Sequence, residues 1–266
     1  MRMAAALLLG AVTLAGARAA ELRPETIQAF DRYIRAVETR VNQRVQPGGP
    51  FLWTGEDVRR AAQVRAGQVA IEHRGGDTIP VPHGLIHDWV GSVFIPGTTL
   101  ARTLALVQDY DRNHDHYQPE VMASRLISRD GDDYKVYLRL MKKKVITVIL
   151  DTEYDVRYFP LDANRCHSRA YSTRIAEVEN AGKADERVLP PGQDHGFLWR
   201  LDTYWRFEER GGGVYVECEA ISLTRSIPAG LGWLIEPIIR SLPRESLENT
   251  LRQTRAALRV GDSQSR

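Results

Sequence analysis

The feature that most constrains this fold is a series of alternating segments between Pro119 and Arg225. Apolar or β-branched residues recur at every second position, which is the spacing of side chains on one face of a strand. Turn sequences separate the segments, among them DGDD, PLDAN and RGGG. Because consecutive strands joined by short turns pair antiparallel, the pattern predicts a meander of five or six antiparallel strands.

The hairpin around Gly211 and Gly212 predicts a register. If these two glycines form a two-residue turn, four pairs share one face: Phe207 with Val216, Trp205 with Cys218, Thr203 with Ala220, and Leu201 with Ser222. On the other face Arg206 meets Glu217 and Tyr204 meets Glu219, which places an ion pair outside. A slip by one residue would destroy both sets of pairs.

The inner face of this hairpin has large rings opposite small side chains. The rings are Phe197, Trp199, Trp205 and Phe207, and the small residues are Cys218, Ala220 and Ser222 on one neighbour and Cys166, Ser168, Ala170 and Ser172 on the other. Small residues on a concave sheet either admit a helix closely or leave room for a ligand, and both interpretations stay open here. The two cysteines are expected about 10 Å apart, beyond disulfide reach, so we predict free thiols.

Helical spacing precedes the meander. PETIQAFDRYIRAVETRVNQRV has apolar residues three and four apart, which predicts one amphipathic helix entered through Pro24 and packed on the domain. A second, short helix is expected from Thr54 to Gly67 at the latest, because TGED offers a capping hydroxyl. Strands begin at about residue 68, and PGTTLARTLALVQDY predicts a third helix capped by Thr98 or Thr99.

The first 20 residues, MRMAAALLLGAVTLAGARAA, have the pattern of a secretory signal peptide. We therefore expect cleavage near Ala19 or Ala20 and a mature protein that is periplasmic or extracellular. Without Arg2 and Arg18 the 36 basic residues fall to 34, equal to the 34 acidic ones. This balance does not suggest a nucleic-acid partner.

The chain ends in an apolar segment, GWLIEPIIRSLPRESL, followed by a helical run and an expected loose tail at residues 261–266. Glu236, Arg240 and Arg244 make the segment a poor membrane anchor. Pro243 is expected to break or kink the helix near Leu242. A core helix and a lid over a cavity remain as interpretations.

The stretch IPGTTLARTLALVQDYDRNHDHYQPEVMASRLISRDGDDYKV resembles the opening of the START-like (SRPBCC) superfamily, which includes polyketide cyclases, coenzyme-Q-binding proteins and Bet v 1-type proteins. The family pattern of a proline break, a helix, an aspartate–tyrosine pair and a tyrosine–proline step is matched by Pro96, Asp109, Tyr110, Tyr117 and Pro119, with Gln118 interrupting the last step. The resemblance covers residues 85–258 and leaves the helical segment 21–67 outside.

The resemblance implies an α+β helix-grip fold for residues 68–260, in which a curved antiparallel sheet wraps a long C-terminal helix around an apolar cavity. Twelve residues are then the predicted ligand contacts: Trp199, Leu201, Trp205, Phe207, Ala170, Ser172, Arg174, Cys218, Ala220, Trp233, Ile238 and Leu242. Arg174 would need either a carboxylate partner such as Glu153 or a ligand anion, and the partner is favoured.

The sequence contains only weak motifs for metal binding or catalysis. NHDH at 113–116 favours a solvated loop over a metal site, because histidines two apart leave a helix on different faces. We expect no metal and no cofactor, and the chain has no nucleophile elbow, Walker loop or dinucleotide fingerprint. The acids that a cyclase or hydrolase of this superfamily could use are Asp202, Glu217 and Glu219, but the register points them away from the inner face.

The sequence thus predicts an exported START-like protein that binds or carries an apolar, lipid-like small molecule, with possible transient contact to a membrane surface. The alternatives are a cyclase- or hydrolase-type enzyme of the same superfamily and a cell-envelope interaction module without a ligand. Neither the ligand nor the oligomeric state follows from the sequence.

Overall fold

The computed structural model describes residues 21–76, 78–143, 146–226 and 232–263, with side chains except in 232–240 and 260–263. The predicted signal peptide lies outside the described residues. The predicted contacts Trp233 and Ile238 have side chains outside them as well.

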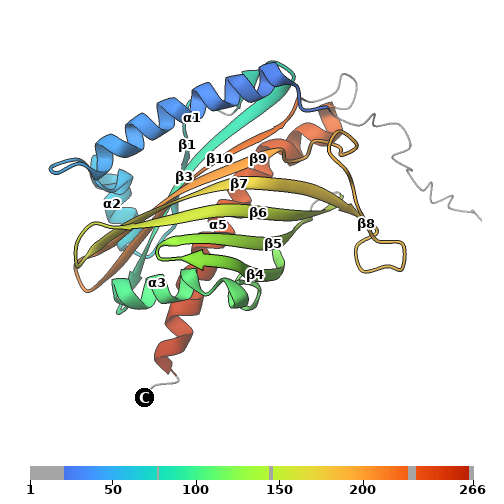
Figure 1. Ribbon diagram of the computed structural model, residues 1–266. Helices are drawn as coiled ribbons and strands as arrows, with labels where there is room; N and C mark the ends of the chain where they lie inside the picture. The colour runs from blue at the N-terminus through green and yellow to red at the C-terminus, as the bar shows by residue number, and fades with distance from the viewer. Residues whose placement is uncertain (1–20, 77, 144–145, 227–231, 264–266) are drawn as a thin grey trace, which may run out of the picture.

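An antiparallel sheet forms the centre of the molecule (Figure 1). Among the described residues its strands are β1 Ala70–His73, β2 Ile79–Val81, β3 Gly84–Pro96, β4 Val121–Asp130, β5 Asp133–Lys143, β6 Thr147–Pro160, β7 Arg165–Glu179, β8 Arg187–Val188, β9 Arg200–Glu209 and β10 Gly213–Arg225. The spatial order is β1-β3-β10-β9-β7-β6-β5-β4, with β2 on β3 and β8 on β7. The meander from β4 to β10 is therefore closed on one side by β3, which pairs with the last strand along its whole length.

The predicted register of β9 and β10 is confirmed. Trp205 lies opposite Cys218, Thr203 opposite Ala220 and Arg206 opposite Glu217. Gly211 and Gly212 have φ angles of 61° and 80°, and Arg210 N donates to Gly213 O at 2.9 Å, which is the two-residue turn that such glycines favour.

The long helix α5, Gly232–Ser263, lies against the sheet at β3 and β10 (Figure 1). This is the helix-grip arrangement that the resemblance implied. The helix is not broken at Pro243, and it extends through residues 261–263, which we expected in a loose tail. No helix of the described ranges combines the length and apolarity needed to span a membrane.

The opposite, outer face of the sheet is covered by the N-terminal segment. Helix α1, Pro24–Val45, buries Phe30, Ile34 and Val37 against the outer side of β3, β9 and β10. The 3-10 turn η1, Trp53–Glu56, and helix α2, Val58–Arg65, cover the end of β3 and β1. This coverage corrects one expectation: the Arg206–Glu217 pair does not lie outside but is buried under this layer.

The second helix begins later than predicted. Thr54 belongs to η1 and is fully buried, whereas Asp57 caps α2 by accepting from Arg60 N at 2.9 Å. The acid therefore supplies the cap that the sequence assigned to the hydroxyl.

Three short helical pieces follow β3: α3 Leu100–Gln108, η2 Tyr110–Arg112 and α4 Asn113–His116. Thr99 caps α3, as expected, by accepting from Arg102 N at 3.3 Å. The NHDH stretch forms α4, packed on β4, where we expected a loop.

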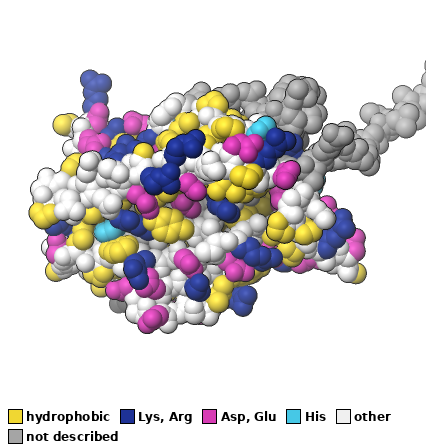
Figure 2. Space-filling view, turned by 45° about the horizontal axis from the view of Figure 1, so that its top comes forward, with side chains coloured by type: hydrophobic (Ala, Val, Ile, Leu, Met, Phe, Trp, Pro, Cys, Tyr) yellow, Lys and Arg dark blue, Asp and Glu magenta, His cyan; other side chains and the backbone are white. Residues whose placement is uncertain are grey.

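Charges of both signs are mixed on the molecular surface. In the view of Figure 2, Lys and Arg side chains alternate with Asp and Glu side chains over the face that is turned to the reader. This distribution agrees with the near-equal numbers of basic and acidic residues in the chain.

Candidate functional site: a cavity under the C-terminal helix

A cavity of about 330 Å³ lies between the sheet and α5. Residues of β4, β5, β6, β7, β9 and β10 form one wall, α5 forms another, and the segment from α3 to α4 closes an end. Its lining is mostly aliphatic and aromatic. A pocket of this size and character is typical of sites that bind one small molecule.

Seven of the predicted contact residues line this cavity: Ala170, Leu201, Trp205, Phe207, Cys218, Ala220 and Leu242. The rings of Trp205 and Phe207 are stacked, with centroids 6.0 Å apart and planes 5° apart. The small residues beside them leave the hollow that the strand-face argument offered as an alternative to a closely packed helix. Their role as ligand contacts remains a prediction.

Arg174 does not line the cavity. It is exposed and pairs with Glu153 at 3.4 Å, the partner that the sequence favoured. The pairing of β6 and β7 shifts between Glu153 and Tyr154, so that Tyr154 faces Ser172 whereas Glu153 faces Arg174. The extra residue, Thr173, reverses the facing of the strand beyond it, which is why an alternation counted from Ser172 misplaced Arg174.

Trp199 and Ser172 also lie elsewhere than predicted. Trp199 precedes the first residue of β9 and packs into the cluster under α1, so the alternation of β9 does not extend to it. Ser172 is buried, but its hydroxyl accepts from Leu201 N at 2.9 Å and it does not line the cavity.

The wall formed by β5 and β6 was not predicted from the sequence. The side chains there share one parity on each strand and are Val136, Leu138, Leu140, Tyr154, Val156 and Tyr158. They recur at every second position, as do the inward-facing residues of β9 and β10, so the sequence does carry a signal for this wall.

Several tyrosine hydroxyls are among the polar groups of the lining. Tyr110 and Tyr158 share a hydrogen bond of 2.9 Å, and Tyr117 bonds the hydroxyl of Thr254 at 3.1 Å. Burial raises the pKa of Tyr110, Tyr117 and Tyr158, so these groups stay neutral at physiological pH.

Charged groups among the described lining residues lie at the rim. Lys142, at the end of β5, forms an ion pair with Glu120 and donates to Ser246 Oγ on α5 at 2.7 Å. Asn249 Nδ2 donates to Glu120 Oε1 at 2.7 Å. These contacts join the C-terminal end of β5 to α5 beside the cavity.

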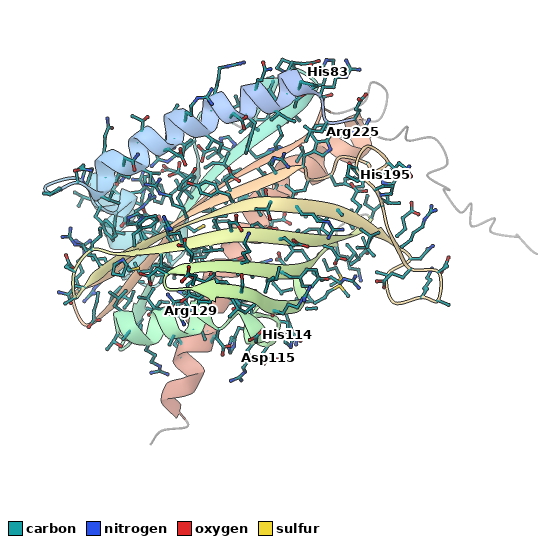
Figure 3. The ribbon with its side chains drawn as sticks, viewed as in Figure 1. His83, His114, Asp115, Arg129, His195 and Arg225 are labelled. Carbon is teal, nitrogen blue, oxygen red and sulfur yellow. The ribbon has the colours of Figure 1, made fainter. Side chains whose placement is uncertain are left out.

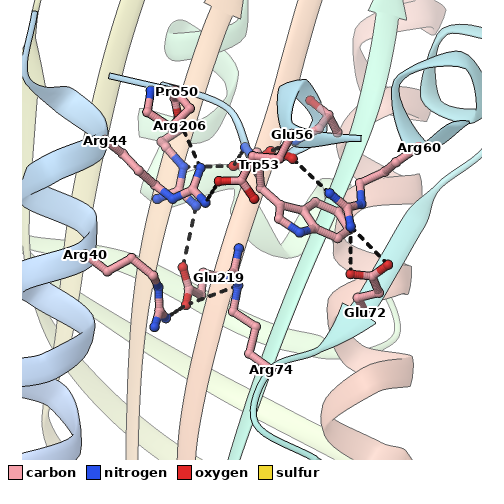
Figure 4. A network of polar contacts seen from close by, with 12 residues as sticks. Arg40, Arg44, Pro50, Trp53, Glu56, Arg60, Glu72, Arg74, Arg206 and Glu219 are labelled. Carbon is pink, nitrogen blue, oxygen red and sulfur yellow. Dashed lines mark hydrogen bonds and ion pairs between the residues drawn. The ribbon is translucent and has the colours of Figure 1, made fainter. Parts of the chain in front are cut away.

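The three acids proposed for an enzyme lie on the other face of the sheet. The carboxylate of Glu217 accepts from Arg206 Nε at 2.8 Å and from the backbone N–H groups of Trp53 and Thr54. Glu219 pairs with Arg40 and lies 3.6 Å from Arg206, within the network of Figure 4. Their bonding is structural, because it joins the N-terminal layer to β9 and β10.

Both cysteines are free and buried, as predicted. Burial raises the pKa of the Cys218 thiol well above its usual value and that of Cys166 to about 11. Thiols in such surroundings are poor nucleophiles.

The histidines are spread over the molecule. Figure 3 shows His83, His114 and His195 in separate parts of it. His114 Nδ1 lies 3.0 Å from Ser124 Oγ, and His195 Nδ1 lies 2.7 Å from the buried Glu177 carboxylate. No cluster of three or more His, Cys, Asp or Glu side chains suited to a metal ion occurs in the described ranges.

No family model matches the chain, and no curated protein does. Several solved structures are similar to it. A protein from Thermus thermophilus has a TM-score of 0.47 and 15% identity over 65% of this chain and 97% of its own. A STAR-related lipid transfer protein fragment from Xanthomonas axonopodis has a TM-score of 0.45 and 17% identity, over 72% of this chain and 98% of its own. The Zhui aromatase/cyclase from Streptomyces sp. R1128 has a TM-score of 0.43 and 9% identity, over 65% of this chain and 93% of its own. At this level of identity and TM-score, the similarity to these structures does not indicate a function for this chain.

Proposed function

We propose that this protein is a START-like binding or carrier protein that holds one apolar, lipid-like small molecule in the cavity between the sheet and α5. The observation that supports this most directly is a hollow of about 330 Å³ lined mainly by apolar side chains. Affinity would come from burial of ligand surface, at about 25 cal/mol per Å² before the costs of ordering are subtracted.

The proposal includes export, which rests on the first 20 residues of the sequence. Expression of the full chain in a bacterium should yield a periplasmic or secreted protein that begins at Ala20 or Glu21. N-terminal sequencing of each cell fraction tests this, and an intact N-terminus in the cytosol would contradict it.

The two alternatives have less support. Asp202, Glu217 and Glu219, the acids named for a cyclase or hydrolase, are absent from the cavity lining. An interaction module would be favoured by a filled gap under α5 and an exposed apolar strip on α1, yet the gap is hollow and Phe30, Ile34 and Val37 are buried.

Native mass spectrometry of the purified mature protein, before and after solvent extraction, tests for a co-purifying ligand. We expect an added mass that extraction removes and that an apolar compound restores. A protein that is empty when purified and that takes up none of a set of apolar compounds would contradict the proposal.

Ala220→Trp tests the location of the site. Ala220 faces the cavity between Thr203 and Trp89, so an indole there should occupy the hollow and abolish uptake while the protein stays folded. Ala256→Trp is the matched control, because Ala256 is exposed on α5. Uptake that survives Ala220→Trp would place the ligand elsewhere.

A further inference from the structure

Asn113 stands out among the residues that line the cavity. It is 7% exposed, and its buried Oδ1 has no hydrogen-bond partner among the described residues. Its side chain makes no capping hydrogen bond at the start of α4. Leaving a buried amide without partners costs about 1–3 kcal/mol, so such groups in native proteins usually have a reason.

The neighbours of Asn113 extend this polar spot. Tyr110, Asn113 and Tyr117 follow one another at spacings of three and four along η2 and α4, which places them on one side of this helical segment, and all three line the cavity. Tyr117 is committed to Thr254, whose own hydroxyl donates to Thr250 O at 2.8 Å. The Tyr110–Tyr158 pair is different, because only one of its two hydroxyl groups donates in their mutual hydrogen bond, so the hydrogen of the other hydroxyl remains for a further partner.

This end of the cavity therefore presents an acceptor and a donor from Asn113 and a hydroxyl hydrogen from Tyr110 or Tyr158. All of these groups are neutral, and the charged pair Lys142 and Glu120 at the rim is satisfied by mutual contact. Burial of an anionic group beside Asn113 would lack a cation to compensate it. A hydroxyl, which both donates and accepts, matches the available partners.

We infer that the cavity selects a neutral amphiphile: an apolar body with one uncharged hydroxyl-type group that hydrogen-bonds to the Asn113 carboxamide beneath α4. This inference rests on the proposed function and specifies its ligand class. Ser222 Oγ, on β10 across the cavity, also lacks a hydrogen-bond partner among the described residues, but it offers a single rotatable hydroxyl rather than a fixed donor and acceptor.

The test compares 1-octanol, octane and octanoate as competitors of N-phenyl-1-naphthylamine, a neutral fluorescent dye, on the mature protein at pH 8. Asn113→Leu keeps the size of the side chain and removes its hydrogen bonds. We expect this substitution to lower the affinity for 1-octanol about five- to tenfold, because one neutral hydrogen bond contributes that much to binding. The affinity for octane should stay the same or increase. In wild type, octanoate should compete more weakly than 1-octanol.

The controls separate the inference from a loss of folding and from the proposed function. Asn164→Leu makes the same chemical change on an exposed loop, so it should change neither the affinity for 1-octanol nor the affinity for octane. Asn113→Leu should unfold at no lower denaturant concentration than wild type, because the buried amide oxygen that it removes has no hydrogen-bond partner in the part of the chain that the structure describes. If it does not fold, Asn113→Ala replaces it in the same comparison.

Several outcomes would overturn the assignment of a neutral, hydroxyl-bearing ligand. The first is that Asn113→Leu changes the affinities for 1-octanol and octane equally, as expected if a resident water satisfies the amide. The second is that octanoate competes as well as 1-octanol. The third is that the preference for the alcohol is lost in Ser222→Ala instead of in Asn113→Leu. If none of the three compounds displaces the dye from wild type, the proposed function itself fails.

Discussion

Gly91 on β3 is the residue on which the close approach of the sheet to α5 depends. A Cβ at this position would lie 2.8 Å from Leu251 Cδ1 and 3.4 Å from Leu247 Cδ2, and Leu251 is fully buried. We expect Gly91→Ala to lower the free energy of unfolding by about 1–3 kcal/mol, the range for overpacking a core. Urea denaturation measures this, and Gly55→Ala, where a Cβ meets nothing within 4 Å, should change little.

Glu217 is the residue that links the N-terminal layer to the sheet. Its carboxylate is fully buried and faces Arg206 and two backbone N–H groups. Glu217→Gln leaves the buried guanidinium with only the more distant Glu219, so the free energy of unfolding should fall by about 3 kcal/mol. Asp133→Asn breaks an exposed pair with Arg157 and should have a much smaller effect in the same denaturation experiment. Equal losses in both variants would mean that burial of the Glu217 pair does not matter.

Helix α1 lies over a buried acid, which makes its layer sensitive to pH. Burial raises the pKa of Asp202 to about 7, and Glu38 and Asp31 on α1 add to the rise while Arg200 opposes it. Between the unfolded value near 4 and about 7, the folded protein holds a proton that the unfolded chain has lost, so stability decreases as pH rises. Asp202→Asn should match wild type in urea at pH 4 and exceed it by a few kcal/mol at pH 8. Asp155→Asn, exposed on β6, should show no such difference between the two pH values.

The strands could be predicted from the sequence where their alternation is regular. The β9–β10 register followed from Gly211 and Gly212, because a two-residue turn leaves one pairing. Arg174 could not be placed in this way, since the irregularity at Thr173 has no strong local signal. The burial of Arg206 could not be predicted from the sequence either. It depends on contacts with η1, which is more than a hundred residues away in the chain.

At the scale of the whole molecule, the two faces of the sheet differ in the residues they carry and in what packs against them. The outer face carries buried ion pairs that hold α1 and η1, whereas the inner face carries small and aromatic residues beside a hollow. The N-terminal helices therefore stabilise strands β9 and β10 through the outer face of the sheet, opposite the cavity. The cavity wall is thus stabilised by contacts other than those with α5. The helical segment outside the START-like resemblance thus has a structural role in this chain.

The contacts between Lys142, Glu120 and Ser246 join the C-terminal end of β5 to α5, so they should control the exchange of ligand. Lys142→Met removes the ion pair and the bond to Ser246, and the apolar residues that line the rest of the cavity stay in place. We therefore expect the association and dissociation rates of an apolar dye to rise together, several-fold, with little change in Kd, because the bound contacts stay the same. Lys135→Met, on the same strand in an exposed pair with Asp155, should leave both rates unchanged in stopped-flow fluorescence. A change confined to the dissociation rate would instead mean that Lys142 contacts the ligand directly, and unchanged rates would mean that ligand enters elsewhere.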